Sequence, residues 1–143
     1  MIKTNFVLCA NRIIRDATDN RISAIDILDS FPAHGFPIVF PRTSMLWVLE
    51  RDQDDVSQIE GSISVTLGDS LIQTFAIPIN FQDQLRTRAI LVIAGMSVNG
   101  PGRLSFAFHR PGLQAPDAVY SIEITAVAVD TSQIPPGTTG IIF

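Results

Sequence analysis

Short segments in which apolar and polar residues alternate recur along the chain, separated by glycine, proline, asparagine and aspartate. Alternation with period 2 is typical of β-strands that have one buried and one exposed face, and no stretch carries the apolar stripe of a helix over three turns. Eight segments are predicted to be strands: 2–10, 21–28, 43–50, 61–67, 71–79, 88–98, 102–110 and 118–130. The pattern predicts an all-β fold, a two-sheet antiparallel β-sandwich of about eight strands.

The stretch 91–112, LVIAGMSVNGPGRLSFAFHRPG, is either a structural hairpin or a site. Its sequence NGPG at 99–102 supplies positions of positive and fixed φ for a chain reversal, and Leu104, Phe106 and Phe108 then alternate with smaller residues. The near-continuous apolar run before the turn indicates burial on both faces or an oligomer contact. We predict a hairpin near the centre of the sandwich, with a structural role.

A long connection at 29–42 interrupts the regular spacing of the strands. Its three prolines exclude a long strand, yet Phe31, Phe36 and Phe40 make it too apolar for a solvated loop. We expect it to cross between the sheets and to bury these rings, together with Trp47, in one end of the sandwich.

The length of 143 residues corresponds to one domain, predicted over 1–130 and followed by a Pro/Gly-rich tail at 131–143. The tail closes on three large apolar residues, Ile141, Ile142 and Phe143. We expect the tail to dock, either on its own sandwich or on a neighbouring copy. Because a tethered apolar segment can join subunits, the sequence favours a homo-oligomer over a monomer.

Charge and cysteine content restrict the partners and the compartment. A net charge of −4 and a pI of 4.9 give no long-range attraction to nucleic acid or to anionic lipid. The N-terminal apolar run is too short for a signal peptide or for a membrane helix, which needs about 20 residues. The single Cys9 lies in an apolar run and is predicted to be a buried structural residue. These observations predict a cytoplasmic protein without nucleic-acid or membrane partners.

Few residues of the chain carry chemistry. The two histidines, His34 and His109, lie far apart in the sequence, no nucleophile motif surrounds any serine, and no glycine-rich phosphate loop precedes a helix. We therefore predict no catalytic residues, no cofactor and no metal ligands. One alternative stays open: Asp52, Asp54 and Asp55 form an acidic loop, and alternating carboxylates can surround calcium.

Several short motifs are shared with a family of small uncharacterised bacterial proteins. They are a first strand that ends in Cys9, a second strand at 22–28, a Phe/Pro-rich crossover, the strand segment at 46–50 and the segment GRLSF at 102–106. The chain resembles this domain of unknown function over roughly 3–130. The resemblance implies a β-sandwich in a bacterial or phage setting and carries no catalytic residues.

Together these observations predict a non-enzymatic binding or assembly module that contacts a protein partner or copies of itself. The alternative is a small-molecule or calcium-binding sandwich with its site at the loop Asp52–Asp55.

Overall fold

The structure, a computed structural model, describes residues 1–128, so the predicted tail 131–143 and the last two residues of the predicted domain lie outside it. Eleven β-strands and no helix occur in the described residues: β1 (Lys3–Arg15), β2 (Ile22–Ile27), β3 (Ser30–Ala33), β4 (Ile38–Val39), β5 (Thr43–Glu50), β6 (Gln58–Leu67), β7 (Ser70–Asn80), β8 (Arg86–Ile93), β9 (Ser97–Val98), β10 (Gly102–His109) and β11 (Ala118–Ala126). Each predicted strand overlaps one of them, and the all-β prediction is confirmed.

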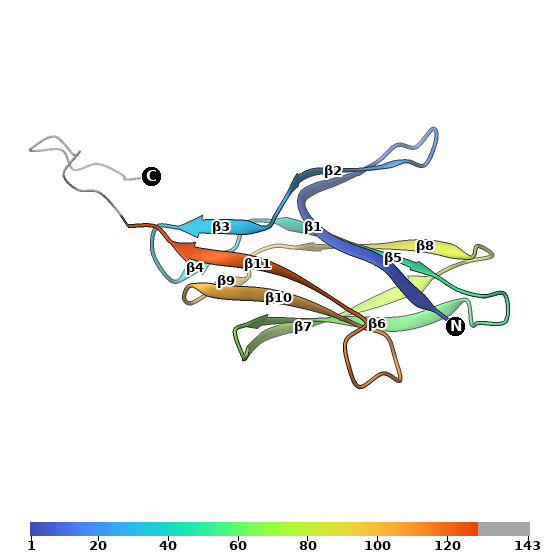
Figure 1. Ribbon diagram of the computed structural model, residues 1–143. Helices are drawn as coiled ribbons and strands as arrows, with labels where there is room; N and C mark the ends of the chain where they lie inside the picture. The colour runs from blue at the N-terminus through green and yellow to red at the C-terminus, as the bar shows by residue number, and fades with distance from the viewer. Residues whose placement is uncertain (129–143) are drawn as a thin grey trace, which may run out of the picture.

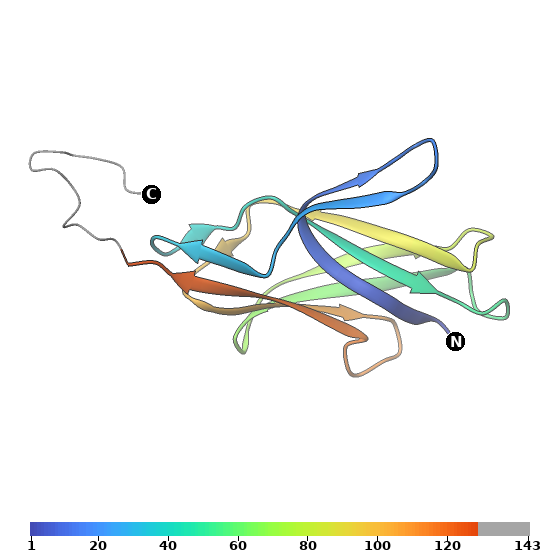
Figure 2. The same cartoon turned by 45° about the horizontal axis from the view of Figure 1, so that its top comes forward.

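Two sheets stack to form the body of the molecule (Figure 1 and Figure 2). Sheet A has four strands in the order β2-β1-β5-β8, and sheet B has five in the order β3-β11-β10-β6-β7. The short strands β4 and β9 pair separately. The arrangement is consistent with the predicted sandwich. Within residues 1–128 no helix is long and apolar enough to cross a membrane.

The core lies between the two sheets and follows the alternation in the sequence. On β10, Leu104, Phe106 and Phe108 are fully buried, as expected from their spacing. From sheet A, Trp47 enters the same core, and its ring meets that of Phe108 edge-on at a centroid distance of 5.2 Å. The sheets are therefore joined by large side chains that the period-2 pattern places on facing sides.

The connection between β6 and β7 is a two-residue hairpin turn, Gly68 and Asp69. Leu67 pairs with Ser70, and Gly68 adopts a φ of 56° that favours glycine. The main-chain N–H of Gly68 also donates to the carbonyl of Arg103, which ties the turn to β10.

The predicted hairpin at 91–112 is wrong. Its first part is β8 in sheet A, whereas its last part is β10 in sheet B. Between them Gly95, with a φ of 77°, ends the strand, and the chain crosses the end of the sandwich with Met96 and Val98 buried. The apolar continuity of this stretch therefore reflects a buried crossover between sheets, which period-2 patterns do not distinguish from a strand.

The long connection at 29–42 contains the short strands β3 and β4 and packs against the core. The rings of Phe31 and Phe40 meet at a centroid distance of 5.4 Å. Phe36 is partly buried and packs against the core. Phe40 and Trp47 are buried as expected, whereas Phe31 and Phe36 are partly buried. Trp47, however, has Phe108 as its ring partner instead of a phenylalanine of this connection.

The first strand is longer than its predicted end at Ala10. It continues to Arg15 and pairs over this second half with β2, so a region expected to be a turn is a hairpin. Asp26 in β2 has a φ of 55°, and the pairing is interrupted there without a change of register.

Candidate functional site

The side chains on the outward side of sheet A are largely apolar. Alternation along β1, β5 and β8 turns one set of residues into the core and the other away from it. The register aligns the second set in three rows: Phe6, Val48 and Arg88; Leu8, Leu46 and Ile90; Ala10, Ser44 and Val92. We call these positions the outer face. A sheet face that meets water is normally polar, so this composition is unusual for an outward side.

Exposure of the outer face is uneven. Leu46, in the middle strand, is 3% exposed, although it points away from the core cluster that contains its neighbour Trp47. At the borders Phe6 on β1 is 50% exposed, and Ile90 and Val92 on β8 are 43% and 44% exposed. The uncovered apolar side chains therefore stand on either side of a covered central strand.

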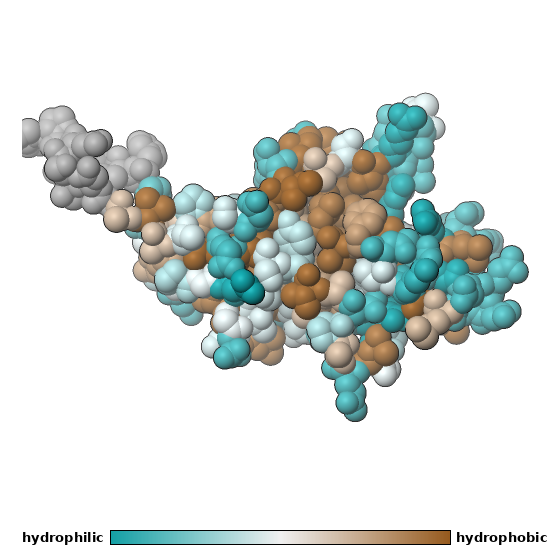
Figure 3. All heavy atoms as spheres, in the orientation of Figure 1, coloured by the Kyte–Doolittle hydropathy of each residue, from teal (hydrophilic) through white to brown (hydrophobic). Residues whose placement is uncertain are grey.

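The hairpin of β1 and β2 extends over the outer face (Figure 1 and Figure 2). Its tip is tied to β8, because Nη1 of Arg88 donates a hydrogen bond of 2.7 Å to the main-chain oxygen of Asn20. Three exposed isoleucines, Ile14, Ile25 and Ile27, lie on this hairpin. Apolar residues gather around its base in Figure 3. The hairpin thus adds apolar area to the outer face.

Charged residues border the outer face at one end. Glu50 lies between Lys3, at 2.7 Å, and Arg86, at 3.4 Å. Hydrogen bonds from Lys3 and then from Asn5 lower the pKa of the Glu50 carboxyl, and the contact with Glu50 raises the pKa of Lys3. These pairs are exposed and add little stability, so they serve as a polar rim for the apolar surface.

The outward side of sheet B differs in composition. Ser62, Ser64, Ser105 and Ser121 point there, and the hydroxyls of Ser105 and Ser121 lie 3.1 Å apart. Val119 is a large exposed apolar residue on this side, at 53%. The contrast makes sheet A the better candidate for contact with a partner.

The acidic loop Asp52–Asp55 is engaged by groups of the chain itself. The N-terminal ammonium of Met1 pairs with the carboxylates of Asp52 and Asp55, the latter at 2.9 Å. The N–H of Asp52 donates to the carboxylate of Asp55, and Arg51 donates to the Asp55 carbonyl. The hydrogen bond from the ammonium is the largest cause of the lowered pKa of Asp55. Among residues 1–128, no three His, Cys, Asp or Glu side chains form a group that could hold a metal ion.

We expect calcium at millimolar concentration to raise the melting temperature by no more than about one degree, since binding to the folded state is what would raise it. Differential scanning fluorimetry with calcium, and with magnesium at equal ionic strength as control, measures this. A rise of several degrees for calcium alone would restore the loop as a cation site.

The residues considered for catalysis do not come together. The register places His34 beside the last residue of β11 and His109 beside its first, so the two imidazoles lie at opposite ends of sheet B. Cys9 is fully buried, as predicted, and burial raises the pKa of its thiol far above the ordinary value. A thiolate nucleophile is therefore not available from Cys9 at neutral pH.

Arg110, at the end of the stretch 91–112, belongs to a network that joins the two sheets. Its Nη2 lies 2.9 Å from the carboxylate of Asp117, which also accepts a hydrogen bond from Thr4, and its Nη1 donates to the carbonyl of Ile2. Thr4 in turn accepts from the indole N–H of Trp47 at 2.8 Å. The Arg110 side chain thus connects the end of β10 in sheet B to residues at the start of the chain, beside sheet A.

The stability supplied by Asp117 should depend on pH. Burial raises the pKa of its carboxyl, but hydrogen bonds from Arg110 and Thr4 outweigh this and leave the pKa below its ordinary value. A lowered folded-state pKa means that the contribution is present above the unfolded value of about 4 and is lost as pH falls through the folded value.

Urea unfolding of wild type and Asp117→Asn from pH 7 to pH 2 tests this. We expect a constant difference in unfolding free energy above about pH 5 that shrinks below about pH 4. A difference independent of pH would contradict the assigned role of the carboxylate.

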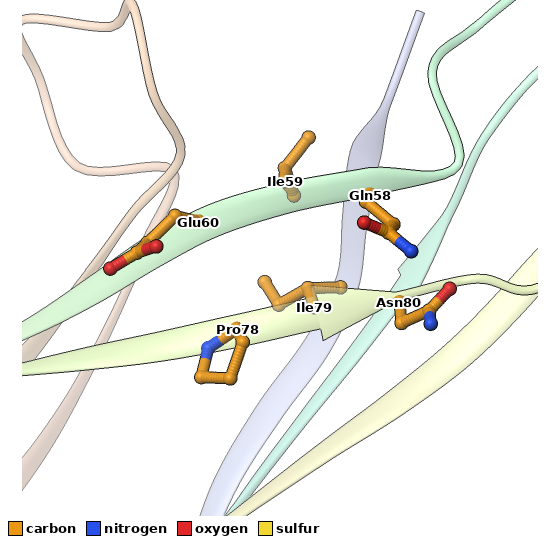
Figure 4. A pocket seen from close by; sticks show the side chains of 6 residues that line it. All are labelled: Gln58, Ile59, Glu60, Pro78, Ile79 and Asn80. Atoms are coloured by element: carbon orange, nitrogen blue, oxygen red, sulfur yellow. The ribbon is translucent and has the colours of Figure 1, made fainter.

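A shallow hollow of 390 Å³ lies on sheet B where β6 begins and β7 ends (Figure 4). Its lining residues are Gln58, Ile59, Glu60, Pro78, Ile79 and Asn80. They are cross-strand neighbours, with Gln58 opposite Asn80 and Glu60 opposite Pro78. Neither histidine lines it, and Glu60 is its one titratable side chain.

No family model and no curated protein matches the chain. The resemblance to a family of uncharacterised bacterial proteins therefore stays a prediction.

Proposed function

We propose that the protein is a non-enzymatic binding and assembly module that joins copies of itself through the outer face of sheet A. The observation that carries the proposal is the exposure of Phe6, Ile90 and Val92 on one sheet face, beside the exposed isoleucines of the hairpin. Exposed apolar side chains that gather on one face beside a polar rim are typical of protein contact sites.

The separation of the two histidines supports a binding role over catalysis. General acid–base or covalent chemistry needs a base within hydrogen-bond reach of a nucleophile and of an orienting acid. In the described residues His34 and His109 lie beside opposite ends of β11, and the thiol of Cys9 is buried.

Sedimentation velocity over about 1–100 μM, a range that spans typical homodimer affinities, tests the proposal. We expect the mass of wild type to rise with concentration and the rise to be lost in Ile90→Lys or Val92→Lys, which place a charge on the β8 side of the outer face.

Val119→Lys is the matched control, because this residue is equally exposed but lies on sheet B. Its mass profile should equal that of wild type. A wild-type protein that stays monomeric, or an association insensitive to both outer-face variants, would overturn the proposed function.

A further inference from the structure

The four edge strands of the two sheets differ in how well they can accept another strand. β3 is four residues long and contains Pro32, and the pairing of β2 is interrupted at Asp26, whose φ is 55°. β7 contains Pro78 and a register shift near Leu71. Proline, bulges and short length all hinder edge-to-edge pairing.

β8 carries none of these features. Its pairing with β5 is continuous from Arg86 to Ile93 without a register shift, and no proline interrupts it. In the described residues no strand pairs with its other edge. It therefore presents a regular row of main-chain donors and acceptors, with Ile90 and Val92 exposed beside them.

We propose that β8 pairs with β8 of a second copy, antiparallel and across a two-fold axis near Ile90, so that the two A sheets form one continuous sheet. This proposal rests on the proposed function and specifies the contact. Each β8 edge would thereby satisfy main-chain groups of the other, and the apolar outer faces would become contiguous.

The charges of β8 favour this partner and this register. Its two arginines, Arg86 and Arg88, lie in its first half, and the segment 89–93 is apolar. With the axis at Ile90, Arg88 lies opposite Val92 of the second copy, and the arginines of the two copies stand at opposite ends of the paired strands. An antiparallel copy therefore brings no like charges together, which a parallel copy would.

Cross-linking tests the geometry. Directly opposed residues of antiparallel strands have Cα atoms about 4.5–5.5 Å apart, within the range that a disulfide spans. We expect Ile90→Cys to form an intermolecular disulfide under mild oxidation. The cross-linked fraction should be close to the fraction of wild type that is dimeric at the same concentration. The native Cys9 is buried and does not compete.

Three matched variants report on other arrangements. Leu71→Cys lies on the β7 edge, Phe6→Cys on the β1 border of the outer face, and Val119→Cys on sheet B; each native side chain is at least half exposed. We expect little cross-linking from all three. A dimer that cross-links through Phe6→Cys or Leu71→Cys, and not through Ile90→Cys, would overturn this inference and leave assembly itself supported.

A charge exchange tests the register without a disulfide. Val92→Arg would face Arg88 of the second copy, and we expect it to raise the dissociation constant at least tenfold. Adding Arg88→Glu to Val92→Arg would place opposite charges face to face and should recover most of this loss. If Val92→Arg weakens the dimer and the added Arg88→Glu does not restore its affinity, the proposed register of the two β8 strands is wrong. A wild-type monomer at every concentration would instead refute the proposed function together with this inference.

Discussion

Trp47→Ala is expected to lower the free energy of unfolding by about 3–5 kcal/mol, because removal of a large buried ring leaves a cavity as well as losing transfer free energy. Trp47 is fully buried in the centre of sheet A, where its ring packs against Phe108. Its indole N–H donates to Thr4, so the variant also removes one bond of the network at Asp117. Urea unfolding monitored by far-ultraviolet circular dichroism measures the change. Tryptophan fluorescence is not suitable, because the variant lacks the only tryptophan of the chain.

Trp47→Phe is the control for this prediction. It retains an aromatic ring in the core and removes the hydrogen bond to Thr4, so a loss of about 1–2 kcal/mol is expected. A loss below 1 kcal/mol in Trp47→Ala would contradict the placement of this ring at the centre of the core.

Alternation predicted the strands but not which sheet each strand joins. The buried residues of β6 and β10 follow period 2, and their faces were predicted because the outward positions carry polar or small residues. The pattern failed in 91–112, where Gly95 divides an apolar run into an edge strand and a buried crossover. Pairing partners depend on where the chain crosses between layers, which is a tertiary property that local patterns do not contain.

The outer face was only partly visible in the sequence. The apolar run that begins at Leu91 indicated burial on both sides or an oligomer contact, and Val92 is exposed at an edge of the sheet. What sequence could not supply was the register that aligns Phe6 with Val48, or the return of the β1–β2 hairpin over the sheet, because both join residues distant in the chain.

Gly61→Ala tests how tightly the sheets pack at the centre. A Cβ atom at Gly61 would lie 2.7 Å and 2.9 Å from ring carbons of Trp47 and 3.1 Å from Cδ1 of Ile79. The indole is rigid and enclosed, so either it or the strand must move, and overpacking of this kind typically costs about 1–3 kcal/mol. We expect a loss near the upper end of that range, even though alanine otherwise favours a strand over glycine by about 0.5–1 kcal/mol. Gly100→Ala, whose Cβ would meet nothing within 4 Å, should change stability by less than about 0.5 kcal/mol.

A double-mutant cycle identifies the cause of that loss. The Trp47 atoms that a Cβ at Gly61 would meet belong to the six-membered ring of the indole. Trp47→Phe has a smaller side chain that lacks these atoms. If the clash with Trp47 causes the loss, Gly61→Ala should lower the free energy of unfolding less in the Trp47→Phe background than in wild type. The expected difference is at least about 1 kcal/mol, a coupling of the size seen for residues in direct contact. Urea unfolding of the four proteins by circular dichroism gives this coupling. Additive losses would mean that the strain arises from Ile79 or from the main chain of β6, and that the indole does not set the spacing between the sheets.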